Sequence, residues 1–186
     1  MDKKKMIAVI GDAGVQETDK KFRLAFDLGR LLIDAGYRVV TGGRGGIMVA
    51  ASAGARDSEA WSPGDIIAIL PGNDPEEANP AADIVIPTGL DIARNMIVAQ
   101  ADAVIAIGGG AGTLSEIAMA WSMKRLMVAY RVEGWSGQLA DTKIDNRQRY
   151  RDDRDDRVFG VDNAFEAVGI IDEYLPLYNR RQRAAV

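Results

Sequence analysis

Short, continuous apolar runs alternate along this chain with segments in which apolar residues recur every three or four positions. Most of the runs are followed by glycine or end in proline, a pattern typical of strands buried on both faces of a sheet. The alternation predicts βαβ units, a mostly parallel sheet and helices on both of its faces. We expect strands over residues 6–10, 37–41, 66–70, 83–87, 101–107 and 126–130.

The segments between the runs have helical periodicity. Gly36 ends the first of these helices and Pro176 is expected to end the last. Pro87 cannot donate to a sheet ladder, so its strand is expected near an edge. We predict helices over residues 19–35, 47–55, 90–100, 113–124 and 163–174, and a loop over 73–82.

The 186 residues form one unit in this interpretation, because no repeat or linker divides them. The predicted fold class is an α/β, Rossmann-like three-layer sandwich over 1–186, with a mostly parallel sheet of about six or seven strands. Residues 131–160 are expected to be an irregular charged segment, and 161–175 to hold the closing helix. Within the former, 147–157 carries five arginines and four aspartates and is interpreted as a solvated surface segment; the alternative is a lid whose arginines meet a substrate phosphate.

Composition excludes several kinds of chemistry. The chain has no cysteine and no histidine, which removes disulfides, thiolate or imidazole metal sites and every histidine-based catalytic triad. The net charge of −4 gives no reason to expect binding to a nucleic-acid polymer. The apolar run after the basic start is too short for a signal peptide, and no window is long enough to span a bilayer, so we expect no membrane association and a cytoplasmic location.

Two glycine-rich turns carry the functional signal. Residues 42–46 and 108–112 each follow a predicted strand and lead into a predicted helix. Ligands of open parallel sheets bind at this edge, where glycines let backbone N–H groups approach a phosphate. A tight turn can need glycine for structural reasons alone, but two such loops favour a crevice for an anion or a nucleotide. The dinucleotide fingerprint is broken in both turns, Thr41 stands where a ribose-binding acid is usual, and no P-loop is present, which disfavours an NAD-type oxidoreductase and a P-loop NTPase.

The segment 108–116 has two interpretations. Thr113 and Glu116 have the spacing of a capping box, in which each side chain bonds the backbone N–H of the other residue, and spacing alone favours this structural role. In the functional interpretation, the N–H groups of 110–113 hold a phosphate and Glu116 faces the crevice one turn into the helix.

The run Gly109-Gly110-Ala111-Gly112-Thr113-x-x-Glu116 resembles the P-G-G-x-G-T-x-x-E signature of the LOG-like superfamily, the cytokinin-activating nucleoside 5′-monophosphate phosphoribohydrolases long misnamed lysine decarboxylases. The stretch 42–48 is similar to the Gly-rich turn followed by Met in that family, and 93–96 falls where the family has an R-K motif. The resemblance extends over residues 7–130, about two thirds of the chain.

The resemblance implies a Rossmann-like protein, a homodimer or higher homo-oligomer, that releases free base and ribose 5-phosphate from a nucleotide. It places the catalytic pair at Arg94 and Glu116. Glycosidic cleavage passes through an oxocarbenium-like state that a carboxylate can stabilise, while an arginine holds the phosphate. No metal or other cofactor is required. The residues expected to cradle the phosphate are Gly43, Gly45, Gly109, Gly110, Gly112 and Thr113.

Three departures from the family pattern point to a second hypothesis. Gly108 replaces the leading Pro, Asn95 replaces the Lys after the arginine, and Asp12 stands where a small hydroxyl residue is usual. These departures resemble a side branch that includes molybdenum-cofactor carrier proteins, which implies a non-catalytic carrier or binder of a nucleotide or of the molybdenum cofactor. Three roles are compatible with the position of Asp12 in the sequence: a contact to a ribose hydroxyl or base amine, a helix cap, or a solvated side chain.

Overall fold

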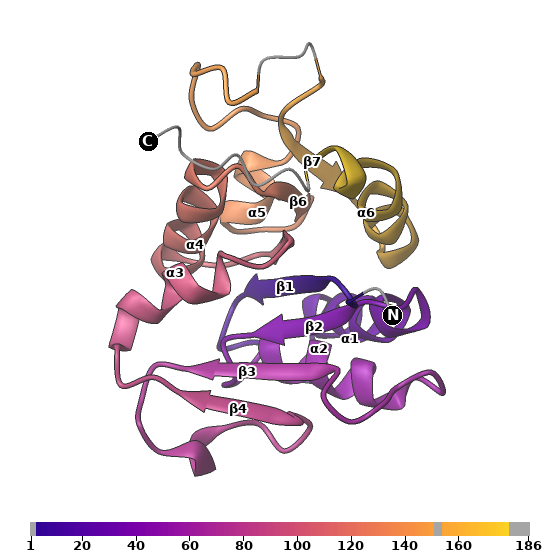
Figure 1. Cartoon of the computed structure of the whole chain (residues 1–186), viewed down its shortest axis with the longest axis vertical. Coiled ribbons are helices and arrows are strands. Elements are labelled where there is room, and N and C mark those ends of the chain that lie inside the picture. The colour runs from indigo at the N-terminus through magenta and orange to yellow at the C-terminus, as the bar shows by residue number, and fades with distance from the viewer. Residues whose placement is uncertain (1–2, 151–153, 179–186) are drawn as a thin grey trace.

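The computed structural model describes residues 3–150 and 154–178, and in these ranges it contains one parallel sheet of seven strands (Figure 1). The strand order is β4-β3-β2-β1-β5-β6-β7, and every neighbouring pair is parallel. The α/β three-layer class predicted from the alternating pattern is therefore confirmed. The strands are β1 (Met6–Gly11), β2 (Arg38–Thr41), β3 (Ile66–Leu70), β4 (Ile84–Pro87), β5 (Ala103–Ile107), β6 (Leu126–Tyr130) and β7 (Val158–Val161).

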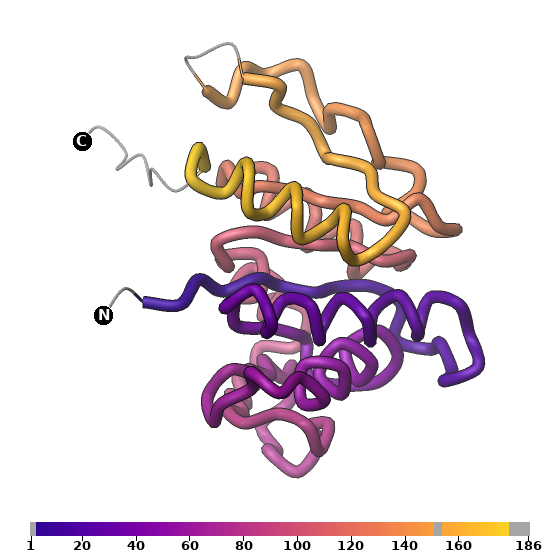
Figure 2. Tube along the Cα trace, turned by 90° about the vertical axis from the view of Figure 1, so that its right-hand side faces the viewer, coloured from indigo at the N-terminus to yellow at the C-terminus, as the bar shows by residue number. Residues whose placement is uncertain are grey.

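Helices cover both faces of the sheet. One apolar core joins the sheet to α1, α2 and α6, and the other joins it to α3, α4 and α5. Figure 2 shows α6 and α1 on the same side of the molecule, where the two helices are in contact. The helices are α1 (Lys20–Asp34), α2 (Ile47–Asp57), α3 (Asn95–Val98), α4 (Ala111–Ser122), α5 (Trp135–Leu139) and α6 (Ala164–Tyr178), with 3-10 turns η1 (Pro75–Glu77) and η2 (Asp91–Arg94).

The sequence pattern matches the burial of the strands. Every residue of β5 and β6 is buried, as their continuous apolar runs require. The strand that ends in Pro87 lies at the edge of the sheet and is largely exposed, which confirms its predicted place. Among the described residues, no helix is long and apolar enough to cross a membrane.

Two of the predicted helices were wrong in extent. The segment 90–100 forms η2 and the single turn α3, because its apolar residues Leu90, Ile92 and Met96 are exposed and have no core to pack against. The closing helix continues through Pro176 to Tyr178. Tyr178 is buried and its hydroxyl donates to Asp156 Oδ1 at 2.8 Å, so tertiary packing holds the last turn despite the proline.

The region 131–160 is more regular than predicted. It contains α5 and the start of β7, a strand whose apolar run is interrupted by Gly160. Within the arginine-rich stretch, Arg149 is buried and stacks 3.5 Å from the ring centroid of Trp121, and its Nη1 donates to the Trp121 carbonyl oxygen at 2.7 Å. The Tyr150 hydroxyl bonds the Lys124 carbonyl.

These contacts bear on the role expected for 147–157. They join the segment to the end of α4 and the turn before β6, the opposite end of that helix from the Gly108–Gly112 turn. Arg149 and Tyr150 are therefore packed, whereas Arg147, Gln148 and Asp155 are exposed, so the expected solvated segment is confirmed only in part. The packed contacts lie away from the glycine turns and do not support a lid over them; residues 151–153 lie outside the described part of the chain.

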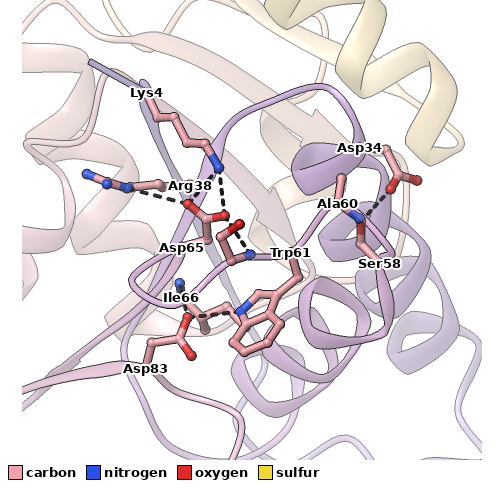
Figure 3. A network of polar contacts seen from close by, with 10 residues as sticks. Lys4, Asp34, Arg38, Ser58, Ala60, Trp61, Asp65, Ile66 and Asp83 are labelled. Carbon is pink, nitrogen blue, oxygen red and sulfur yellow. Dashed lines mark hydrogen bonds and ion pairs between the residues drawn. The ribbon is translucent and has the colours of Figure 1, made fainter. Parts of the chain in front are cut away.

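A polar network fixes the amino-terminal edge of the sheet near β3 and β4 (Figure 3). Asp65 accepts two bonds from Lys4 Nζ, at 2.7 and 2.9 Å, and pairs with Arg38. Asp83 accepts from Trp61 Nε1 and from the Ile66 N–H, both at 3.0 Å. Because the network lies at the amino ends of the strands, the carboxyl ends are free to form a site.

Substituting Asp83 by alanine tests how much this network contributes to the free energy of unfolding. The Asp83 side chain is almost fully buried, and its loss leaves the Trp61 and Ile66 N–H groups without an acceptor. We expect Asp83→Ala to lower the free energy of unfolding by about 2–3 kcal/mol in urea denaturation. The control Asp57→Ala, at an exposed position, is expected to change it by less than about 0.5 kcal/mol. Equal effects of the two substitutions would contradict the assignment.

Candidate functional site

A cavity of about 230 Å³ lies at the carboxyl ends of β1, β2 and β5. Strand order reverses direction between β1 and β5, so this is the switch point at which open α/β sheets bind ligands. The structure brings six of the predicted site residues together in its lining. They are Asp12, Arg94, Gly110, Gly112, Thr113 and Glu116.

The first glycine turn shapes the wall of this cavity. A Cβ atom on Gly42 would lie 2.7 Å from both Nη1 and Nη2 of Arg94, so the guanidinium rests directly on the Gly42 backbone. Gly43 has φ +78°, and its N–H donates to Thr41 Oγ1 at 3.1 Å. Neither Gly43 nor Gly45 lines the cavity, and Gly45 borders a separate hollow on the surface. Their role in holding a phosphate stays a prediction.

The second glycine turn is held from the side of α5. Ser136 Oγ accepts from the Gly108 N–H at 2.7 Å, and the Trp135 N–H donates to the Gly109 carbonyl at 3.0 Å. Gly134 packs so closely that a Cβ atom there would lie 2.7 Å from the Gly108 carbonyl carbon. This clamp was not predicted from the sequence; the Gly-Trp-Ser run after β6 is the signal that could have indicated it.

Gly108 and Gly109 have positive φ values, and a Cβ atom on Gly109 would lie 2.4 Å from the Thr113 side chain. Gly109 is therefore needed for the turn and does not line the cavity. Gly110 and Gly112 have no neighbouring atom within 4 Å of an added Cβ, so they leave open space in front of the first turn of α4.

That first turn offers backbone donors to the cavity. Gly110 occupies the N-cap position of α4 and provides no side-chain hydrogen bond to the helix. The first N–H groups of a helix have no partner within it, and they carry the positive end of the helix dipole. An anion in the cavity would meet these groups at residues 111–113.

The capping box predicted for Thr113 and Glu116 is wrong. The helix begins at Ala111, two residues earlier than expected, which places Thr113 inside its first turn. The Thr113 hydroxyl donates to the Gly11 carbonyl at 3.2 Å, a contact to β1, and the Glu116 carboxylate faces Arg94. The Glu116 side chain therefore lies in the wall of the cavity rather than folded back on its own helix.

Arg94 and Glu116 form an ion pair at the cavity wall. Arg94 Nη1 donates to Glu116 Oε1 at 3.0 Å, and the side chains are 14% and 7% exposed. Burial raises the pKa of Glu116 to about 7, and the neighbouring Arg94 charge opposes this rise. At neutral pH this carboxyl is thus divided between its protonated and ionised forms, as a general acid or base requires. Arg94 Nε is buried and has no hydrogen-bond partner within residues 3–150 and 154–178.

Asp12 and Lys21 form a second ion pair, at 2.7 Å, beside the Gly108 turn. Asp12 is not the cap of α1, because Asp19 occupies that position and accepts from the Lys21 N–H at 2.8 Å. Lys21 was not predicted; its place in the first turn of α1 brings it to Asp12 only through the tertiary fold. The pair puts a cation and a carboxylate at the border of the crevice.

Comparison with known proteins gives the context of this site. The profile of the SLOG cluster4 family matches residues 4–162. The structure of the molybdenum cofactor binding protein from Rippkaea orientalis is similar, with 32% identity, a TM-score of 0.74 and coverage of 91% of this chain and 96% of that one. The molybdenum cofactor carrier protein from Chlamydomonas reinhardtii has 26% identity and a TM-score of 0.73, over 93% of this chain and 99% of that one.

An uncharacterized protein of Archaeoglobus fulgidus is 41% identical over 113 residues, which are 60% of this chain and 72% of that protein. DNA processing protein A from Helicobacter pylori shares the fold alone, with 19% identity and a TM-score of 0.56. Together the comparisons confirm the resemblance to the LOG-like superfamily and to the side branch with molybdenum-cofactor carriers.

The raised pKa of Glu116 predicts a pH-dependent stability. Between pH 4.5 and about 7 the folded state keeps a proton on Glu116 that the unfolded state releases, so this group lowers stability as the pH rises. We expect the free energy of unfolding of Glu116→Gln, relative to the wild type, to increase by roughly 2–3 kcal/mol between pH 4.5 and pH 8. Urea denaturation of both proteins at several pH values in this range measures the difference in the free energy of unfolding. A difference that does not change with pH would contradict the raised pKa.

Proposed function

The chain belongs to the SLOG cluster4 family, and from this premise we propose that its crevice binds a phosphorylated, nucleotide-like small molecule and carries it without cleaving it. The molybdenum cofactor is the first candidate ligand, because two structural neighbours are described as binding or carrying it. A nucleotide is the alternative ligand of the same chemical class.

One observation carries the proposal: the open first turn of α4 and the Arg94 guanidinium line the same small cavity. The N–H groups of 111–113 would hold phosphate oxygens, and Arg94 would supply the opposite charge. Gly110 and Gly112 leave the space that a phosphate needs. The cavity of about 230 Å³ is smaller than most ligand pockets, so it would enclose the phosphate end of the ligand while the rest extends past Ile92.

Two features favour a carrier over a hydrolase. The Glu116 carboxylate accepts a hydrogen bond from Arg94, so in this state it is not free to act on a sugar. Asn95 supplies no positive charge where the phosphoribohydrolases have a second cation. The cleavage of a nucleoside 5′-monophosphate stays a second candidate because of the Glu116 pKa near 7.

Substituting Gly110 by valine tests the binding site. The added side chain would enter open space, so we expect the fold to survive while the phosphate position is filled. The protein is produced in a host that makes the molybdenum cofactor, and molybdenum retained after purification is measured; a panel of nucleoside monophosphates is titrated by calorimetry. We expect at least tenfold less retention or affinity in Gly110→Val.

The matched control is Gly169→Val, an exposed glycine of α6 with equally open surroundings, which should bind as the wild type does. Wild-type affinity in Gly110→Val would contradict the proposed site. Release of free base and ribose 5-phosphate from any nucleotide, abolished by Glu116→Gln, would replace the carrier function by the hydrolase.

We propose in addition that the chain is a homodimer or higher homo-oligomer. The small apolar residues of α2 and α4 pack inside the fold and cannot form a subunit contact: Ala51, Ala55, Ile117 and Ala120 are fully buried. Apart from Phe165 and Leu177 on α6, the exposed large apolar side chains lie on β4 and the segment after it. They are Ile84, Ile86, Leu90, Ile92 and Met96.

Light scattering tests this proposal. Ile92 is 60% exposed and also lines the crevice, so a neighbouring subunit there would border the ligand. We expect the wild type to have at least twice the chain mass and Ile92→Glu to shift it toward the monomer. Phe165→Glu, at a more exposed apolar position on α6, is the control that should not dissociate. A monomeric wild type would contradict the proposal.

The cytoplasmic location, and the absence of binding to nucleic-acid polymers, stay predictions.

A further inference from the structure

Asn95 is a buried amide in the wall of the crevice. It begins α3, directly after Arg94, and is 1% exposed. It lines the same cavity as Gly112 and Glu116. No role beyond replacing a family lysine follows for it from the sequence.

Hydrogen bonds fix which way the amide points. Ser115 Oγ donates to the Gly112 carbonyl at 2.7 Å, so its hydrogen is used and its oxygen accepts from Asn95 Nδ2 at 2.8 Å. Nδ2 also lies 3.3 Å from the Gly112 carbonyl, which can only accept. Exchanging the amide oxygen and nitrogen would set two acceptors against each other, so Nδ2 faces α4 and Oδ1 faces away from it.

Oδ1 has no hydrogen-bond partner among the described residues, although it is buried. A buried acceptor without a donor costs free energy, and such atoms in native proteins call for a specific explanation. Arg94 Nε is a second unpaired buried atom on a residue of this cavity. Nδ2 alone would hold α4 in place; Oδ1 adds nothing to that role.

We infer that Asn95 determines ligand specificity: its Oδ1 accepts a hydrogen bond from an N–H or O–H donor of the bound molecule. A carbonyl oxygen repels phosphate oxygens, so Asn95 cannot share the role of Arg94 and the α4 N–H groups. It selects instead for a donor on the other part of the ligand, an amino group of the heterocycle or a hydroxyl of the sugar. The inference rests on the proposed function, since it names what the same crevice recognises beyond the phosphate.

Ligand pairs that differ in one donor distinguish the two sources. Guanosine and inosine 5′-monophosphates differ in the 2-amino group, and adenosine and 2′-deoxyadenosine 5′-monophosphates differ in the 2′-hydroxyl. Calorimetry with the full chain should show at least tenfold tighter binding of the donor-bearing member in one of these pairs. In Asn95→Leu, which removes the acceptor at similar volume, the two members of that pair should bind equally.

Two further variants separate recognition from folding. Ser115→Ala removes a partner of Nδ2 but leaves Oδ1, so the preference for the donor-bearing member should persist. Asn95→Lys, the residue type of the resembled family at this position, replaces the acceptor by a donor and should reverse the preference. If Asn95→Leu does not fold, Asn95→Lys tests the same loss of the acceptor. The molybdenum retained on purification should fall at least tenfold in either Asn95 variant but not in Ser115→Ala.

The outcomes are distinguishable. Two results would overturn the inference while leaving the proposed function intact. One is an unchanged ligand preference in both Asn95 variants. The other is a wild type that binds both members of each pair equally, together with an Asn95 variant that retains molybdenum fully. A wild type that binds no nucleotide and retains no molybdenum would overturn the proposed function, and the inference with it.

Discussion

The Arg94 guanidinium connects the separate parts of this site. It lies on the backbone of Gly42, at the end of β2, and pairs with Glu116 from the buried side of α4. Residues from three separate segments therefore meet at one side chain, which is possible only because Gly42 has no Cβ atom. A charged pair this deeply buried is costly unless further hydrogen bonds satisfy its remaining polar atoms. The pair lies beside the open first turn of α4, where a bound phosphate would be a second hydrogen-bond partner for the guanidinium.

Because the chain has no histidine or cysteine, the Arg94–Glu116 pair is among the few groups that can act on a ligand in the crevice. A crevice without imidazole or thiol must act through backbone N–H groups, carboxylates and cations. The described cavity contains these groups: the first turn of α4, Arg94 with Glu116, and Asp12 paired with Lys21. Such a set suits the recognition of a phosphorylated molecule. Whether Glu116 also does chemistry depends on its release from Arg94, because only then can it approach a sugar.

Much of this could be predicted from local sequence, and the rest depended on contacts between distant segments. Six of the seven strands, the two glycine turns and the grouping of Arg94 with Glu116 follow from apolar runs, glycine clusters and a family resemblance, whereas β7 was not predicted because Gly160 interrupts its short apolar run. The capping box failed because Thr113 bonds Gly11, about a hundred positions away in the chain, and α4 begins earlier. The clamp by Ser136 failed to be predicted for the same reason.

Other side chains show the same limit of local pattern. Lys21 and Arg149 look like ordinary surface charges in the sequence, yet one pairs with Asp12 at the crevice and the other is buried against Trp121. Only the tertiary fold determines which charges are solvated and which have partners. Asn95 belongs to this group as well, since the direction of its amide is set by Ser115 and Gly112.

The central claim is that a phosphorylated ligand sits against the first turn of α4. Amide chemical shifts of ¹⁵N-labelled protein, titrated with guanosine 5′-monophosphate and separately with inorganic phosphate, test it most directly. We expect the largest shifts to fall on the N–H groups of residues 110–113, at the Gly110 end of α4. Shifts that gather instead at the arginine-lined cavity around Trp121 and Arg149, at the other end of the same helix, would contradict it.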